Sequence, residues 1–299
     1  MKGGWLVKVL LTGGTGFIGR YVSAELAARA IPAVLLGRRP PSDAAHKYIP
    51  CDLLDPYAIG SAVRAAGASH LLHLAWYTEH GKYWESRENL RWLEATSHLV
   101  ACFNDAGGRR SVIAGTCAEY DWSMGSCSEA DTPLAPASLY GVAKDATRRL
   151  AEAMCRQDRT EIAWGRIFFN YGAGEPASRL VPSLIAALTG KSPPFSVDLT
   201  SRRDFLHAAD IARGFVALLD APVTGAVNIS SGVATPVSGV VATLARLLGA
   251  DPKPVFDLGA ERPGQPREIM GVNGRLGTTG WRQELSLEQG LKHVLDGYA

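Results

Sequence analysis

The sequence lacks several features that would indicate particular classes of protein. No apolar run among its 299 residues approaches the roughly 18 that cross a membrane. The formal net charge is only +2, which gives no electrostatic reason to expect nucleic acid. The five cysteines form no CxxC pair, and the seven histidines have no metal-ligand spacing. We therefore expect a cytoplasmic protein with reduced thiols, a small-molecule substrate, no metal and no membrane partner.

The first half of the chain alternates between apolar, strand-like segments and helix-like segments. The expected strands are 5–11, 33–36, 71–75, 111–114 and 162–169. One helix is expected after the glycine-rich stretch, where Ile18, Val22 and Leu26 recur at helical spacing, and two more over 89–103 and 139–154. The strand segments are mostly apolar and do not alternate with polar residues, which is typical of a parallel sheet covered on both faces. This pattern predicts an α/β fold with a Rossmann-like, doubly wound parallel sheet.

After Tyr171, proline and glycine become frequent and the expected elements are shorter. We expect a helix at 210–219, a strand at 226–229 that rejoins the sheet, a loop-rich stretch at 252–266 and a last helix at 287–295. This predicts a dinucleotide-binding domain over 1–169 plus about 203–230. A smaller α/β C-terminal substrate-binding lobe would take about 170–202 plus 231–299, with the chain crossing back once.

A glycine-rich turn lies in the stretch LLTGGTGFIGR at residues 10–20. Gly14, Gly16 and Gly19 have the spacing of a dinucleotide-binding turn between a strand and a helix, and Gly13, Gly16 and Gly19 fit a wider variant of it. Without side chains there, a pyrophosphate can approach the amides at the helix start, near Phe17 and Ile18. The alternative is a tight turn that holds no ligand.

The end of the second expected strand indicates which coenzyme is used. An acidic residue about 20 positions after the glycines usually binds the adenosine ribose. Arg38 and Arg39 stand there instead. A guanidinium binds a 2′-phosphate in a fork, so the pair favours NADP(H) over NAD(H). Two solvated arginines on a loop are the alternative.

Three hydroxyl and amine side chains form a candidate catalytic set. Tyr140 and Lys144 are four residues apart on an expected helix, so they face the same side. We expect the Lys144 ammonium to favour the phenolate and lower the pKa of Tyr140. Thr116 follows an expected strand, at the edge where open α/β sheets bind ligands. Tyr140 would exchange a proton beside a hydride carrier, and Thr116 would polarise a carbonyl or, alternatively, only cap a turn.

The order and spacing of these motifs resemble the extended short-chain dehydrogenase/reductase family, the NAD(P)-dependent nucleotide-sugar epimerases, dehydratases and reductases. The resemblance covers nearly the whole chain. Its landmarks are TGGTGFIG (12–19), CDL (51–53), HLA (73–75), GTCAEY (115–120), YGVAK (140–144), RRDFLHAADIA (202–212), NISSG (228–232), RPG (262–264) and GW followed by SLEQGL (280–291).

The resemblance implies a role for each matching residue. Thr116, Tyr140 and Lys144 match the catalytic residues of the family. Asp52 and Leu53 match positions that contact the adenine end of the coenzyme, and Ala75 matches a position along it. Arg203 and Arg262 match arginines that hold the diphosphate of a sugar nucleotide. Arginine suits a diphosphate because its fork binds two oxygens. Surface ion pairs are the alternative for both arginines.

Two departures from the family pattern narrow the expected reaction. Family dehydratases carry Asp-Glu directly after the catalytic threonine, whereas this chain has Cys117 and Ala118, which argues against elimination of water. Phe169 stands where a substrate-binding asparagine is common, and Asn170 comes one residue later as the candidate substrate contact.

An aromatic-rich stretch follows the third expected strand. Trp76 could stack on a sugar or on the nicotinamide, or it could pack under a loop. His73 lies just before it and is expected to be structural, because the sequence places no carboxylate partner beside it.

We therefore expect an NADPH-dependent reductase of a nucleotide-linked keto-deoxysugar, of the 4-ketoreductase type, with Tyr140 as proton donor. The alternatives are a nucleotide-sugar epimerase of the same family with tightly bound NAD(P) and a non-catalytic NADP-binding sensor. The resemblance also suggests a homodimer through the 89–103 and 139–154 helices.

Overall fold

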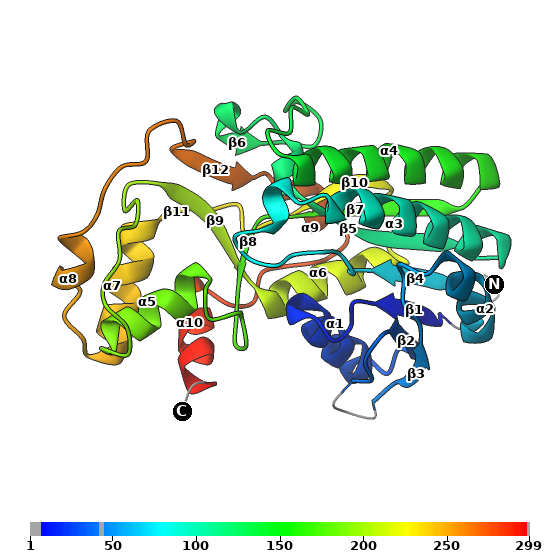
Figure 1. Ribbon diagram of the computed structural model, residues 1–299, viewed down its shortest axis with the longest axis horizontal. Coiled ribbons are helices and arrows are strands. Elements are labelled where there is room, and N and C mark those ends of the chain that lie inside the picture. Colours follow the sequence, from blue (N-terminus) through cyan, green and yellow to red (C-terminus); the bar gives the residue numbers. More distant parts are fainter. Residues whose placement is uncertain (1–6, 42–44, 298–299) are drawn as a thin grey trace.

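Short, mostly apolar segments form the larger of two sheets in the computed structural model, which describes residues 7–41 and 45–297. Seven parallel strands lie in the order β10-β7-β5-β4-β1-β2-β3 (Figure 1). They are β1 (Val9–Thr12), β2 (Ala33–Gly37), β3 (Lys47–Pro50), β4 (His70–His73), β5 (Arg110–Thr116), β7 (Glu161–Ile167) and β10 (Gly225–Ile229). The Rossmann-like parallel sheet predicted from the sequence is confirmed, and its carboxyl edge is where ligands of such sheets bind.

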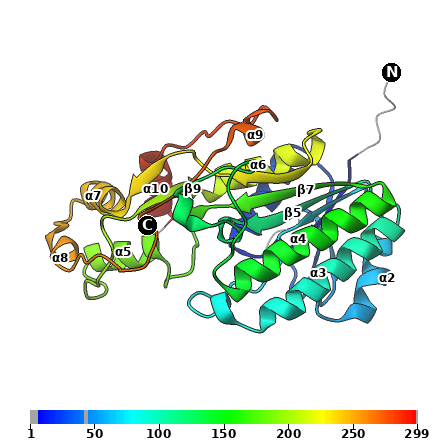
Figure 2. The same ribbon diagram turned by 90° about the horizontal axis from the view of Figure 1, so that it is seen from above.

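Helices cover both faces of this sheet (Figure 2). They are α1 (Phe17–Ala28) and α6 (Ala208–Asp220) on one face, and α2 (Pro56–Ala66), α3 (Glu88–Asp105) and α4 (Leu139–Asp158) on the other. Successive strand residues point to opposite faces, so Val9 and Leu11 pack with α1 and α6 while Leu10 packs with α2 and α3. Two buried cores therefore sandwich the sheet.

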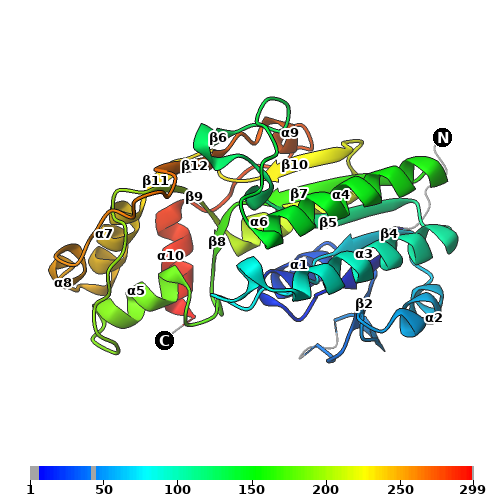
Figure 3. The same cartoon turned by 45° about the horizontal axis from the view of Figure 1, so that its top comes forward.

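The second lobe is built on a smaller sheet (Figure 3). Its strands are β6 (Ser126–Cys127), β8 (Phe169–Tyr171), β9 (Arg202–His207), β11 (Ala234–Pro236) and β12 (Glu268–Gly271), in the order β11-β9-β12-β6 with β8 also paired to β9. Its helices are α5 (Leu180–Leu188), α7 (Val237–Leu248), α8 (Lys253–Phe256) and α10 (Leu287–Asp296). The domain boundary proposed near residue 203 thus falls inside β9, whose partners are all strands of this sheet.

The chain returns to the first lobe twice, not once as predicted. The first return is α6 and β10, and β10 pairs with β7, so the strand expected at 226–229 does rejoin the sheet. The second return is α9 (Gly274–Gly277) and the residues after it. Leu276 in α9 and Trp281 beyond it pack into the core beside α1 and α6. Trp281 also donates its indole N–H to the Asp210 carbonyl at 3.0 Å. This second return was missed because its apolar residues are too few to show a helical period.

Several elements were not predicted, and the first expected strand begins outside the described residues at Trp5. The described strand starts at Val9. Helix α2 was missed although Asp55 caps it and Gly67 ends it in the left-handed conformation, both ordinary helix signals. Within the described ranges, no helix is long and apolar enough to cross a membrane.

Candidate active site

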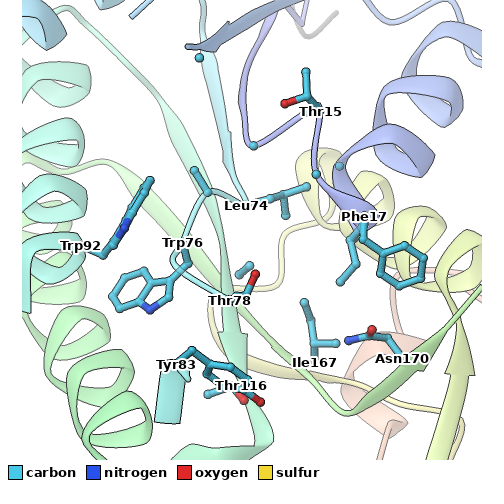
Figure 4. Close-up of a pocket in the computed structure, with 18 of the residues that line it drawn as sticks. Thr15, Phe17, Leu74, Trp76, Thr78, Tyr83, Trp92, Thr116, Ile167 and Asn170 are labelled. Carbon is cyan, nitrogen blue, oxygen red and sulfur yellow. The ribbon is translucent and has the colours of Figure 1, made fainter. Parts of the chain in front are cut away.

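A cavity of about 450 Å³ lies at the carboxyl edge of the larger sheet, between the two lobes. Its walls come from the glycine turn, from the residues that follow β2, β3, β4 and β5, from the start of α4, and from β8 and the segment after it. Figure 4 shows Thr15 and Phe17 at one end and Thr116 and Tyr83 at the other. The predicted coenzyme residues and the predicted catalytic residues therefore face one continuous space.

The glycine turn closes tightly around the end of β1. Gly13 has φ +73°, and a Cβ on it would lie 2.7 Å from the Ala75 amide nitrogen. A Cβ on Gly19 would lie 1.9 Å from the Gly13 carbonyl oxygen, so any side chain would push α1 from the strand. The N-cap of α1, Gly16, supplies no side-chain hydrogen bond. The amides of Phe17 and Ile18 are thus left for an anion, and the turn fits a dinucleotide pyrophosphate.

The far end of the cavity carries the residues predicted for the adenosine. Arg38 and Arg39 are exposed and line it directly after β2. Asp52 and Leu53 line it after β3, and the Asp52 carboxylate accepts the Leu54 amide at 3.0 Å. Ala75 lines it after β4. The described residues directly after β2, 38–41, include no acidic side chain.

The predicted catalytic set meets at the buried end of the cavity. Thr116 is the last residue of β5, and Tyr140 and Lys144 lie in the first turns of α4, all three buried and all lining the cavity. Thr116 caps the following turn, since its hydroxyl oxygen accepts the Ala118 amide at 3.2 Å. It also hydrogen-bonds Tyr140. The turn-capping role of Thr116 is therefore confirmed, and its action on a substrate carbonyl stays a prediction.

The predicted effect of Lys144 on Tyr140 is wrong. Burial raises the pKa of the Tyr140 phenol, with the Thr116 hydrogen bond opposing it. Lys144 instead donates to the Ala114 carbonyl at 2.8 Å and lies 3.8 Å from the centre of the Trp76 ring. Burial lowers the pKa of Lys144 to about 7. The lysine is therefore held beside the tyrosine by the end of β5 and by an aromatic face.

No carboxyl group follows Thr116 directly into the cavity. Burial raises the pKa of the Cys117 thiol well above its usual value, and Ala118 cannot titrate. The next residue, Glu119, is buried and turned away, because it accepts hydrogen bonds from Arg166 at 2.7 Å and from Trp164 at 2.8 Å. The argument against a dehydratase thus extends to the geometry. Sequence reasoning missed Glu119, although Thr-x-x-Glu is a capping-box signal.

Aromatic side chains form the wall beside Tyr140. In the short helix η1 (Tyr83–Glu85), Tyr83 and Trp84 place their rings edge-on to Tyr140 at 4.8 and 5.7 Å between centroids. Trp76 lines the cavity, but its N–H donates to Asn89 at 2.9 Å and one face carries Lys144. The indole N–H and one face of Trp76 therefore already have partners within the protein, and the rings that pack directly on Tyr140 are Tyr83 and Trp84.

The predicted substrate contacts do not all reach the cavity. Asn170 lines it, and its side-chain oxygen is buried without a partner among the described residues. The Arg203 guanidinium instead donates to the carbonyls of Arg202 and Arg267 at 2.9 and 3.3 Å, and it does not line the cavity. Arg262 is exposed on the loop before β12, also outside the lining.

His73 is structural, as predicted. Its ring nitrogens hydrogen-bond Thr12 at 2.6 Å and Thr96 at 2.9 Å, and burial lowers its pKa to about 3. Among residues 7–41 and 45–297, no group of three or more histidine, cysteine or acidic side chains is placed to hold a metal ion.

The sheet, the glycine turn and the buried Tyr-Lys-Thr set define a coenzyme-binding enzyme of the Rossmann type. The sequence model of the NAD dependent epimerase/dehydratase family matches residues 9–230, and the chain belongs to that family, the extended short-chain dehydrogenase/reductases.

The proteins similar to this chain include nucleotide-sugar enzymes of different activities, among them a reductase and an epimerase. GDP-6-deoxy-D-mannose reductase of Pseudomonas aeruginosa is 26% identical over 97% of each chain. The dTDP-L-rhamnose 4-epimerase of Burkholderia thailandensis is 26% identical over 95% of this chain and 93% of the relative. The solved structure of MoeE5 in complex with UDP-glucuronic acid and NAD is 29% identical, with a TM-score of 0.84 over 97% of this chain and 98% of that one.

Proposed function

We propose that this protein is an NADPH-dependent reductase that reduces the keto group of a nucleotide-linked deoxysugar, of the 4-ketoreductase type. One observation carries the proposal: a single cavity joins Arg38 and Arg39 to Thr116 and Tyr140, with no acid–base group directly after Thr116. The similarity to a GDP-6-deoxy-D-mannose reductase supports it.

NADPH bound along the glycine turn would supply the hydride. Tyr140 stays protonated at neutral pH because burial raises its pKa, so it holds the proton that the carbonyl oxygen requires. The Thr116 oxygen accepts an amide, and its own proton, which bonds Tyr140 in the free protein, would turn to the same carbonyl once the substrate is bound. Lys144, fixed on Ala114, would hold the coenzyme ribose beside Tyr140.

The direct test is NADPH oxidation by the purified protein with GDP- and dTDP-linked 4-keto-6-deoxy sugars. We expect the NADPH absorbance to fall in proportion to sugar added, with one reduced sugar formed for each coenzyme oxidised. A protein that binds NADPH but oxidises none of it with any of these substrates would refute the reductase assignment.

Coenzyme preference is tested separately with Arg38→Ala and Arg39→Ala. Hydrogen bonds to charged groups are worth about 1.5–3 kcal/mol, so we expect NADPH affinity to fall ~10- to 100-fold while NADH affinity stays within about twofold. Arg156→Ala is the matched control, since Arg156 is exposed on α4 and does not line the cavity. Equal losses for both coenzymes would contradict a 2′-phosphate contact.

An epimerase is the second candidate, favoured by the similarity to dTDP-L-rhamnose 4-epimerase. An epimerase oxidises and re-reduces one carbon, so it must retain its coenzyme through the cycle. Mass spectrometry of the protein as isolated separates the two, because coenzyme at full occupancy favours the epimerase.

The proposed homodimer would use the outer surface of α3 and α4. Three large apolar side chains are about half exposed there: Leu90 at 52%, Val142 at 48% and Leu150 at 47%. The two helices pack side by side, so a second copy could cover all three residues (Figure 2).

A further inference from the structure

A segment of the second lobe reaches back to the first across one side of the cavity. It comprises residues 172–179, which we call the strap, and it joins β8 to α5. The carbonyl of Ala173 accepts hydrogen bonds from Tyr21 at 2.9 Å and from Arg20 at 2.8 Å, both on α1. The strap is therefore fixed against the helix that follows the glycine turn.

The strap contains a buried carboxylate that the proposed mechanism does not use. Glu175 is 7% exposed, and its Oε1 accepts the Arg179 Nε at 2.7 Å. Its Oε2 is buried without a partner among the described residues. Burying a half-satisfied carboxylate costs stability, so this pair is a poor device for stability alone. Its effect is to fix the direction of the Arg179 side chain.

Arg179 lies in the cavity wall, close enough to Tyr83 for its charge to act on that side chain. It lines the cavity, and its charge lowers the pKa of Tyr83 against the larger upward effect of burial. Tyr83 in turn packs edge-on to Tyr140 at 4.8 Å. The positive charge of Arg179 also adds to the burial that lowers the pKa of His80, which lies before η1.

The donors of Arg179 are only partly used. Nε binds Glu175, and Nη2 donates to the Asn170 carbonyl at a long 3.4 Å. Nη1 has no hydrogen-bond partner among the described residues, and the side chain is 30% exposed. A guanidinium has donors and no acceptor, so a partner in the cavity must offer an oxygen lone pair.

We propose that Arg179 determines sugar specificity by donating hydrogen bonds to an oxygen of the substrate's hexose, and that Glu175 is the residue that positions it. This rests on the proposed function, because it takes a sugar nucleotide as the ligand. The oxygen is a hydroxyl or keto oxygen of the ring, since the charge of Arg179 acts on Tyr83, whose ring packs against Tyr140 at the end opposite the adenosine residues. Neither residue was singled out in the sequence.

The test measures what the sugar adds to binding. Titration calorimetry with NADP present compares UDP-glucose, dTDP-glucose and GDP-mannose with UDP, dTDP and GDP, and the pair that binds wild type most tightly is carried forward. In Arg179→Gln we expect the affinity of the sugar nucleotide relative to its diphosphate to fall ~10- to 100-fold. Affinities for the diphosphate and for NADP should stay within about twofold, and Arg179→Lys should fall between.

Arg20→Gln is the matched control. Arg20 holds the same strap through Ala173 but does not line the cavity. We expect it to leave the relative sugar affinity unchanged. Equal losses in Arg20→Gln and Arg179→Gln would mean that the strap's structure matters and not a sugar contact, and would overturn the proposal. The proposal would also be overturned if Arg179→Gln kept the relative sugar affinity of wild type, or if its affinity for the diphosphate or for NADP fell as well.

The role of Glu175 is tested by pH. Burial raises its pKa to about 7, so its carboxylate ionises between about pH 6 and pH 8 and then holds Arg179 more firmly. Arg20 and Arg179 are the cations that face this pair, and Tyr21 stays neutral because its pKa is raised. The pKa of His80 is lowered, so any proton that His80 loses in this range is lost in wild type and in Glu175→Gln alike.

We expect the relative sugar affinity of wild type to strengthen about severalfold as the pH rises through 7, and that of Glu175→Gln to stay flat. A melting temperature and NADP affinity matching wild type confirm that the variant is folded. An unchanged pH profile in Glu175→Gln overturns the positioning role. If wild type binds the sugar as described but never oxidises NADPH with a keto sugar, the proposed reaction fails while the Arg179 contact stands.

Discussion

Replacing Glu119 with alanine should lower the free energy of unfolding by about 3–5 kcal/mol. The side chain is fully buried, and its carboxylate accepts from Arg166 at 2.7 Å, Trp164 at 2.8 Å and the Thr116 amide at 2.9 Å. Arg166 is 1% exposed and would retain Tyr120 as a hydrogen-bond partner. The variant therefore leaves a buried guanidinium without a counter-charge, which is the costly way to break an ion pair.

The assay is equilibrium unfolding in urea, with Glu161→Ala as the matched control. Glu161 also pairs with an arginine, Arg110, but its side chain is 60% exposed, and Arg110 keeps the carbonyls of Leu218 and Val223. An exposed pair of this kind is worth about 0–1 kcal/mol. If Glu119→Ala cost no more than Glu161→Ala at an unchanged urea dependence, the reasoning from burial would be refuted.

Three further outcomes are expected. Tyr140→Phe should reduce NADPH oxidation by about 10²- to 10⁴-fold with unchanged NADPH affinity, and unaltered turnover would favour a sensor. His73 is neutral when folded, with its pKa lowered from 6.5 to about 3, so below pH 6.5 the unfolded chain gains a proton that the folded chain refuses. Stability should then fall by ~1 kcal/mol per pH unit on acidification, with a shallower slope for His73→Gln. Leu150→Glu should convert a dimer to a monomer in light scattering, whereas Tyr57→Glu, on α2 and 94% exposed, should not.

Local patterns in the sequence determined the first lobe and the coenzyme turn. Mostly apolar, non-alternating runs such as 33–36 and 111–114 became buried strands, because a strand covered on both faces needs no polar face. Gly13 and Gly19 could be assigned from spacing alone, since the close approach of backbone to backbone there depends on a missing Cβ and not on distant contacts. The positions of Thr116, Tyr140 and Lys144 at one edge followed from the same topology.

Only the tertiary structure decided where long, charged side chains point and which short strands pair. Arg203 turns to backbone carbonyls and Lys144 to the end of β5, because a buried cation takes the nearest strong acceptor, which no spacing rule specifies. Strands β9, β11 and β12 pair across thirty or more residues of chain, so no local period marks them. The Glu175–Arg179 pair gains its meaning from burial and from facing Tyr83, which only the folded chain provides.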